Sequence, residues 1–400
     1  MREVIGFPCP DDRFRGTADL AFVVRGRPPF PSAIFEPPGA FERHSSWANW
    51  PALRTLRGPA ILRLFRILAQ GDMLRRMFPA SPRHPLDERG LFLVQNPSLR
   101  ARIMPLFSFD PRFPSERPIG HGTTFRIDPW GTCATAFHVI EDLLGVKGNT
   151  AALRDDIRLV ALELEGIAMG RVPIPQDSWR PFEAMFSICA IERPPLQPPR
   201  VRNGTELSAL SIARSGNVRG ASPFLPMDLR RWRPTVGERI MALGFPDLDV
   251  DHSDAGDDRP FSQYIYGSEA TIIEIQEADG GSGRPWPVFR VEANWPGGMS
   301  GGPVFNGAGH VIGIVSTGLV GVDVGTATYF SGWNMPEQTF RSIDPSNPGS
   351  VYGWGGFDAS GRFVAFAGSQ SDIIDAREEY EIEEIVAITS NPETGDYMHL

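Results

Sequence analysis

A glycine-rich segment around Ser300 has the composition of a loop that presents a nucleophilic serine. Residues 295–305 read WPGGMSGGPVF. Flanking glycines let a backbone turn tightly and approach a substrate closely. The N–H groups of Gly298 and Ser300 can then point at one spot, where they would hold the oxyanion of a tetrahedral intermediate. The pattern predicts acyl transfer at Ser300, although an ordinary glycine turn could account for the same short string.

His138 provides the base that such a serine requires. It ends the apolar run at 131–138, GTCATAFH, which follows a second run at 122–127, GTTFRI. A nucleophilic serine needs a base within hydrogen-bond reach, and imidazole titrates near neutral pH. A lone histidine in an apolar run is more often a packed core residue. Here, however, the histidine precedes the serine by about 160 residues, an order found in chymotrypsin-like enzymes and reversed in α/β-hydrolases.

These segments resemble the chymotrypsin-like serine proteases, in particular the bacterial trypsin-like and Deg-type enzymes. Residues 236–246, VGERIMALGFP, look like the strand that opens the second barrel of that family, and residues 309–316, GHVIGIVS, look like the strand after its nucleophile. The resemblance spans roughly residues 100–332. It implies a serine endopeptidase that works through an acyl-enzyme, with Ser300 attacking, His138 moving the proton and no cofactor.

The third member of the catalytic triad departs from the family pattern. The family places an acid at the start of a strand reading D-I/V-A-x-L, and the matching strand is taken as 186–192, FSICAIE. In that register Ser187 stands at the acidic position, and Glu183 is the second candidate. A serine can orient an imidazole but brings no charge, and neutralising the acid can cost about four orders of magnitude in rate. Three more acids stay open as candidates: Asp177, and in another register Asp155 or Asp156.

Substrate preference is expected to depend on the residues that flank the nucleophile in the sequence. By family spacing, residues 292–295 reach the wall of the specificity pocket, and Asn294 lies near its base. Ser316, Thr317 and Gly318 are expected to form the edge strand to which an extended peptide adds. Because Asn294 carries no charge, we expect an uncharged substrate side chain rather than arginine or lysine.

Met299 precedes the nucleophile where zymogen-type relatives carry an aspartate. In those relatives the aspartate pairs with a freshly cut N-terminus. Methionine cannot form that ion pair, so activation by N-terminal cleavage is not expected here.

The elements that must position these residues read as short strands. From about residue 95 to 335, apolar or β-branched runs recur between Gly, Pro, Asp and Asn. Many short strands with turn signals indicate an all-β sandwich or barrel. Together with the resemblance, this predicts a protease domain at 95–335 built as a chymotrypsin-like double antiparallel β-barrel, with six strands in each barrel.

A basic leader is expected before this domain, at 1–94. Residues 1–117 contain 18 arginines and 11 acidic residues, whereas the remainder contains 21 basic and 37 acidic residues. The leader is Pro-rich and reads as irregular or partly helical. Residues 53–78 form a basic amphipathic pattern, which we expect to pack on the protein itself, with a membrane surface or an acidic partner as the alternative. An early start assignment, with translation beginning at Met73 or Met104, is another hypothesis.

An acidic extension is expected after the domain, at 336–400. It begins with a glycine- and aromatic-rich part, and residues 371–388 read either as a helix or as a helix followed by a strand. This extension is expected to be a short α/β tail without chemistry of its own.

The cysteine content and the lack of long apolar runs indicate where in the cell the protein is expected. The three cysteines, Cys9, Cys133 and Cys189, are an odd number and show no zinc spacing, so a reducing compartment is inferred. No signal-peptide or transmembrane run is visible. We expect a cytoplasmic bacterial protein that acts on a protein or peptide, with a regulatory protein partner possible and no nucleic-acid partner. Because the triad acid is unassigned, the alternative is an inactive pseudo-protease that serves as a peptide-binding scaffold.

Overall fold

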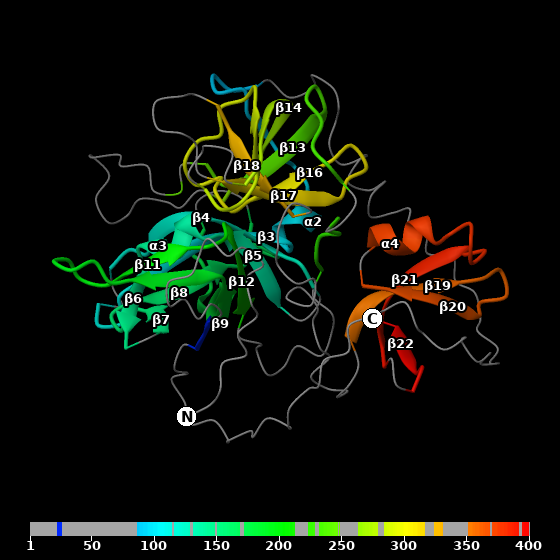
Figure 1. Cartoon of the computed structure of the whole chain (residues 1–400), viewed down its shortest axis with the longest axis horizontal. Coiled ribbons are helices and arrows are strands. Elements are labelled where there is room, and N and C mark those ends of the chain that lie inside the picture. The colour runs from blue at the N-terminus through cyan, green and yellow to red at the C-terminus, as the bar shows by residue number, and fades with distance from the viewer. Residues whose placement is uncertain are drawn as a thin grey trace. The chain divides into compact units, whose positions relative to one another are not determined.

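A computed structural model describes two compact units of the chain (Figure 1). The first unit holds described residues within 22–25 and 86–330, and the second holds those within 351–399. The described residues are 22–25, 86–113, 116–128, 131–148, 150–168, 172–212, 223–228, 232–246, 248, 263–278, 284–316, 324–330, 351–368, 370–391 and 394–399. The expected helix at 53–78 and most of the leader therefore lie outside the described residues.

Six strands of the first unit close into the first barrel. They are β3 (Ile103–Phe109), β4 (Ile119–Arg126), β5 (Thr132–Ala136), β8 (Arg158–Leu162), β9 (Trp179–Ser187) and β12 (Leu207–Ile212). Every neighbouring pair is antiparallel in the order β9-β12-β5-β4-β3-β8, and pairing of β8 with β9 closes the ring. Strand β1 (Phe22–Arg25) adds to β9 from outside the ring.

Six further strands of the same unit close into the second barrel. They are β13 (Arg239–Gly244), β14 (Tyr266–Gln276), β15 (Val288–Val291), β16 (Pro303–Phe305), β17 (Val311–Ser316) and β18 (Thr326–Tyr329). The antiparallel order is β13-β16-β17-β18-β15-β14, and β13 pairs with β14 to complete the ring. Strand β2 (Phe92–Leu93) adds to β14. The sequence-based prediction of an all-β double barrel is confirmed.

Short hairpins and helices lie between the barrel strands in the sequence. Two hairpins, one short 3-10 helix and two four-residue helices are described in this unit: β6 (Leu144–Lys147) with β7 (Thr150–Leu153), β10 (Cys189–Glu192) with β11 (Arg200–Asn203), η2 (Gln176–Ser178), α2 (Pro97–Arg100) and α3 (His138–Glu141). Helix α3 follows β5 directly. It therefore carries His138 at the rim of the first barrel.

Alternating inward side chains fill both barrels, as expected for closed sheets of this size. The largest buried side chains of the first barrel include Phe107 and Phe125. The second barrel is centred on three aromatic rings: Trp232 meets Phe289 edge-on at 5.7 Å, and Phe289 stacks on Tyr329 at 6.2 Å. The first core continues without a break into residues of β13 and β17, so buried apolar surface joins the two barrels.

The second unit is a four-stranded antiparallel sheet with one short helix. Its elements are β19 (Val351–Phe357), β20 (Phe363–Ala367), α4 (Gln370–Asp375), β21 (Glu384–Ser390) and β22 (Tyr397–His399), in the sheet order β20-β19-β21-β22. The acidic segment is thus a helix followed by a strand, one of the two structures expected for it. Glycines of β19 leave room for neighbouring side chains: a Cβ on Gly355 would lie 2.6 Å from Ile388 Cδ1.

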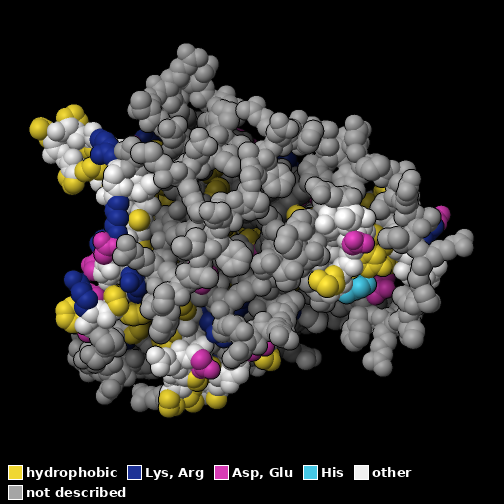
Figure 2. Space-filling view, turned by 90° about the horizontal axis from the view of Figure 1, so that it is seen from below, with side chains coloured by type: hydrophobic (Ala, Val, Ile, Leu, Met, Phe, Trp, Pro, Cys, Tyr) yellow, Lys and Arg dark blue, Asp and Glu magenta, His cyan; other side chains and the backbone are white. Residues whose placement is uncertain are grey.

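Surface charges of both signs lie near one another on the face seen in Figure 2. In the hairpin of β10 and β11, Glu192 accepts from Arg200 at 2.7 Å and from Arg202 at 2.9 Å. Such exposed pairs contribute little to stability. In the described part of the chain no helix has the length and apolar character needed to cross a bilayer.

The two described cysteines are buried, and this leads to a test of the packing. Burial raises the pKa of the Cys133 thiol to about 12 and that of Cys189 to about 11. At pH 8 both groups are protonated and shielded, and the thiolate is the reactive form. We expect iodoacetamide to leave both unmodified in the native protein and to alkylate both in guanidinium chloride, as read by peptide mass spectrometry. Rapid native alkylation of Cys133 would contradict this core packing.

Candidate active site

His138 is held at the rim of the first barrel by its apolar neighbours. It begins α3, and the side chains before and after it, Phe137, Val139 and Ile140, are all buried. With these three anchored in the core, the imidazole is left partly exposed, at 24% of its side-chain surface. The apolar run that contains the histidine therefore fixes its position without burying it.

A buried carboxylate, that of Glu206, contacts the imidazole. Glu206 Oε1 lies within hydrogen-bond reach of His138 Nδ1, and the Glu206 side chain is only 2% exposed. The carbonyl of the same residue accepts the N–H of Phe137 at 2.6 Å. One residue thus holds both the ring of the histidine and the backbone just before it.

Two further donors satisfy the buried carboxylate. Ser316 Oγ of β17 donates to Glu206 Oε1 at 3.1 Å, and Asn203 Nδ2 donates to Oε2 at 3.4 Å. A buried charge is costly unless it is hydrogen-bonded, so these donors make an ionised carboxylate tolerable here. Since Ser316 belongs to the second barrel, Glu206 also connects the two barrels.

The surroundings of His138 are acidic. The pKa of the Glu141 carboxyl is raised by burial, and the neighbouring charges of Glu206 and Asp142 raise it further. Carboxylates from α3 and from the residue before β12 therefore surround His138.

The structure pairs His138 with Glu206 and not with the acids or the serine expected from the sequence. Ser187 is 1% exposed, and its hydroxyl donates to the carbonyl of Leu207 at 3.1 Å inside the barrel wall. Glu183 is exposed on β9. The remaining candidate acids also lie elsewhere: Asp177 is in η2, Asp155 pairs with Lys147, and Asp156 lies near Arg112 and Arg154.

A signal for Glu206 was present in the sequence. Residues 206–210 read ELSAL, and Glu206 directly precedes β12, which matches an acid followed by an apolar strand of the D-I/V-A-x-L kind. The acid lies 68 residues after His138. The segment at 186–192 matched the apolar part of the pattern but lacked the acid, and in the structure it spans the end of β9 and the start of β10.

Some N–H groups of the loop around Ser300 have backbone partners among the described residues, and others do not. The N–H of Met299 donates to Pro296 O at 3.3 Å, that of Gly301 to Val315 O at 2.8 Å and that of Gly302 to Met299 O at 2.9 Å. Within the described residues, no hydrogen bond takes the N–H of Gly298 or of Ser300. The backbone needs glycine at two points of this turn, since φ is +87° at Gly298 and +81° at Gly301.

Close backbone contacts bring this loop to the segment that carries His138. A Cβ on Gly122 of β4 would lie 2.7 Å from Ser300 O and 3.0 Å from both γ-carbons of Val139. A Cβ on Gly301 would overlap Thr135 Oγ1 and lie 2.9 Å from Ala136 N. The backbone at Ser300 and Gly301 therefore packs directly against the residues around His138, and the space between them is too small for a side chain on either glycine.

Thr123 of β4 fastens the loop with both its backbone and its side chain. Its N–H donates to Ser300 O at 2.8 Å, and its hydroxyl donates to Gly298 O at 2.7 Å. The same hydroxyl accepts the N–H of Phe245 at 3.1 Å, while the Thr123 carbonyl accepts from Thr135 Oγ1 at 2.8 Å. The buried threonine thereby sets the geometry of the residues on either side of Met299.

The expected cleft residues are only partly described. Asn294 is exposed on the segment that leads to the loop, and Ser316 is buried against Glu206. Thr317 and Gly318 lie outside the described residues. The preference for an uncharged substrate side chain therefore stays a prediction at this point.

Comparison with known families agrees with this geometry. Residues 122–314 match the family model described as a trypsin-like peptidase domain. The chain contains a trypsin-like peptidase domain. The match runs from β4 into β17 and includes His138, Glu206 and Ser300. No curated protein matches the chain.

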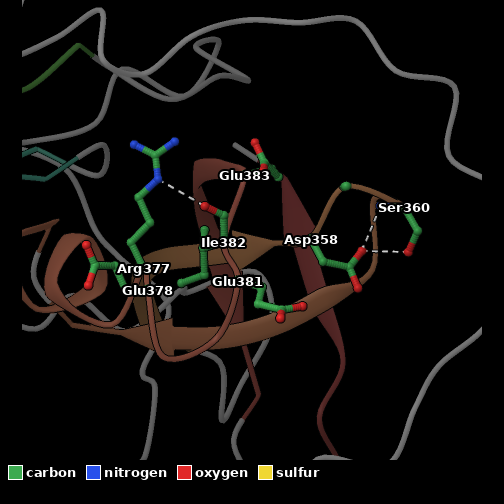
Figure 3. Close-up of a pocket in the computed structure, with 8 residues that line it drawn as sticks. Asp358, Ser360, Arg377, Glu378, Glu381, Ile382 and Glu383 are labelled. Atoms are coloured by element: carbon green, nitrogen blue, oxygen red, sulfur yellow. Dashed lines mark hydrogen bonds between the residues drawn. The ribbon is translucent and has the colours of Figure 1, made fainter.

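A pocket in the second unit offers no comparable chemistry. It is lined by Asp358, Ala359, Ser360, Arg377, Glu378, Glu381, Ile382 and Glu383. Figure 3 shows the carboxylates of Glu378, Glu381 and Glu383 pointing in different directions. Asp358 accepts from Ser360, and Arg377 donates to Ile382 O at 3.0 Å. No group of three metal-ligating side chains is found in the described part of the chain.

Thr123→Val tests whether the threonine hydroxyl shapes the loop. The substitution keeps the shape but leaves Gly298 O and the N–H of Phe245 without their partner. We expect a stability loss of about 1–3 kcal/mol. We also expect at least about a tenfold slower reaction of Ser300 with a fluorophosphonate probe, because the unpaired N–H of Gly298 then loses its fixed direction.

Thr124→Val is the matched control for this test. Thr124 is as buried as Thr123, but its hydroxyl donates to Ala134 O at 2.9 Å within the first barrel. We expect a similar loss of stability with little change in the labelling rate. Equal labelling rates in the two folded variants would show that Thr123 has no special effect on the loop.

Proposed function

We propose that this protein is a serine endopeptidase that hydrolyses peptide bonds through an acyl-enzyme, with Ser300 as nucleophile and His138 as general base. The observation that carries the proposal is the buried Glu206 at His138 Nδ1. A carboxylate there favours the tautomer that has its proton on Nδ1. Nε2 is then free to accept the proton of the Ser300 hydroxyl.

The first half of the reaction forms the acyl-enzyme. Ser300 Oγ attacks the substrate carbonyl carbon while His138 Nε2 takes the hydroxyl proton, giving a tetrahedral oxyanion. The N–H groups of Gly298 and Ser300 donate to that oxyanion. When the intermediate collapses, the C–N bond breaks and His138 gives its proton to the leaving amine.

The second half restores the enzyme. A water molecule loses a proton to His138 Nε2 and attacks the ester carbonyl, and the same two N–H groups hold the second oxyanion. The C–O bond to Ser300 then breaks, the serine oxygen regains the proton from His138, and the acid product leaves. No cofactor takes part in this sequence.

Glu206 takes the place of Ser187 as the proposed third member. It supplies the negative charge that Ser187 lacks, and that charge stabilises the imidazolium formed in each half-reaction. Its donors Ser316 and Asn203 keep the carboxylate oriented toward the ring. An intact charge partner favours an active enzyme over the pseudo-protease alternative.

The unpaired N–H groups of the loop support the proposed oxyanion site. Gly298 and Ser300 are partly exposed, so their N–H groups are open to a substrate oxygen. An oxyanion would accept from both. Hydrogen-bonding of Met299, Gly301 and Gly302 to other carbonyls keeps the loop in the conformation that leaves these two donors open.

The proposal is tested by fluorophosphonate labelling of the full chain together with peptide hydrolysis. We expect wild type to be labelled and to cleave an unfolded protein substrate such as casein. Ser300→Ala and His138→Ala should abolish both signals. Glu206→Gln should lower the rate of hydrolysis by about three to four orders of magnitude, because it removes the charge and disturbs the histidine tautomer.

Ser187→Ala and Glu183→Gln are the controls for Glu206→Gln. Both residues lie outside the hydrogen-bond network of His138, so their variants should hydrolyse substrate within a few-fold of the wild-type rate. If Ser187→Ala or Glu183→Gln were as slow as Glu206→Gln, the assignment of Glu206 would be wrong. If folded wild type were neither labelled nor active, the pseudo-protease alternative would take its place.

A further inference from the structure

Trp295 belongs to the segment that, from its spacing to Ser300, is expected to reach the wall of the specificity pocket. Trp295 is five positions before Ser300, and Pro296 after it begins the turn that carries Gly298. The turn is short and closed by the hydrogen bond from Met299 N–H to Pro296 O at 3.3 Å. Trp295 is therefore tied closely to the donors proposed to hold the oxyanion.

The indole fills the space against the start of β18. A Cβ on Gly325 would lie 2.6 Å from Trp295 Cδ2, 2.8 Å from Cε3 and 2.9 Å from Val291 Cγ2. The indole nitrogen is buried, and the ring packs on the core of the second barrel. The absence of a side chain at Gly325 thus makes room for the ring.

The backbone around the indole is fixed by the extended ladder of β15 and β18. The N–H of Val291 donates to Gly325 O at 3.0 Å, and the N–H of Gly325 donates to Ala293 O at 2.5 Å. These bonds hold the two backbone segments beside the ring, at residues 291–293 and at Gly325, in place. Movement of the indole out of this space would require the ladder or the core contacts to change.

We propose that Trp295 closes the specificity pocket, so that the protease prefers alanine, serine or glycine as the residue whose carbonyl is attacked. This inference rests on the proposed function and names its substrate class. The residues around the indole, Val291, Ala293, Trp295 and Gly325, are uncharged, whereas Glu292 on the same segment is exposed, so the space that the indole fills offers no charge partner to arginine or lysine. A filled pocket excludes large side chains by shape, since the size of the pocket limits the side chains that a serine protease accepts there.

The test measures kcat/KM for peptides that differ only at that residue, with alanine, serine, leucine, phenylalanine or arginine. Rates are divided by the fraction of enzyme labelled by a small fluorophosphonate. We expect wild type to hydrolyse the alanine peptide at least about 100-fold faster than the phenylalanine or arginine peptide. Trp295→Leu should raise the phenylalanine-to-alanine ratio at least about tenfold, because the space beside Gly325 opens.

Trp286→Leu is the matched control, since Trp286 is a buried tryptophan of the same barrel that belongs to neither the loop nor the pocket wall. It should keep the wild-type ratio. If Trp295→Leu fails to fold, Trp295→Phe provides a smaller opening and a smaller shift in the same direction.

The outcomes separate the two proposals. Labelled wild type that prefers phenylalanine or arginine, or a labelled and folded Trp295 variant with an unchanged ratio, would overturn the role of Trp295 and leave the serine protease intact. Folded wild type that is not labelled would overturn the proposed function and the pocket with it.

Discussion

Thr123 joins the two barrels at the point where the candidate active site is assembled. Each barrel closes on itself, so the residues on facing rims are related only through contacts between the barrels. Thr123 makes three hydrogen bonds across that boundary, to Ser300 O, Gly298 O and the N–H of Phe245. Gly122 and Gly301 remove the side chains that would hold the rims apart. The distance between the serine and histidine sides is thereby set by backbone contact, which varies less than contact between long side chains.

Glu206 makes the second connection, and its energetics differ from those of Thr123. A neutral hydroxyl in a good network adds modest stability, whereas a buried carboxylate is strongly destabilising if one of its partners is lost. The carboxylate of Glu206 contacts His138 on its own barrel and Ser316 on the other. Its burial thus favours the one arrangement of the barrels in which both partners are in place. The same interactions that keep the imidazole oriented also make that arrangement specific.

Much of the fold followed from sequence because short apolar strands and turn residues are local signals. The double barrel, and the order of its histidine and serine segments, could be predicted in this way. The partner of His138 could not, because the choice between segments 186–192 and 206–210 depends on which strand ends beside the histidine. Both read as apolar strands, and only the pairing of β12 with β5, which sets Leu207 opposite Ala136, brings Glu206 to the ring. The role of Gly325 was equally hidden, since a glycine does not reveal which distant side chain occupies its space.

Met299 gives the loop around Ser300 an unusual source of rigidity. Its side chain is completely buried in the core of the second barrel, and a Cβ on Gly244 would lie 2.8 Å from its Cα. A loop held by an ion pair loosens when salt screens the charges or when the acid is protonated. Apolar burial has neither dependence near room temperature, and added salts such as sulfate even strengthen it. This anchor of the loop is therefore not weakened by added salt or by acid.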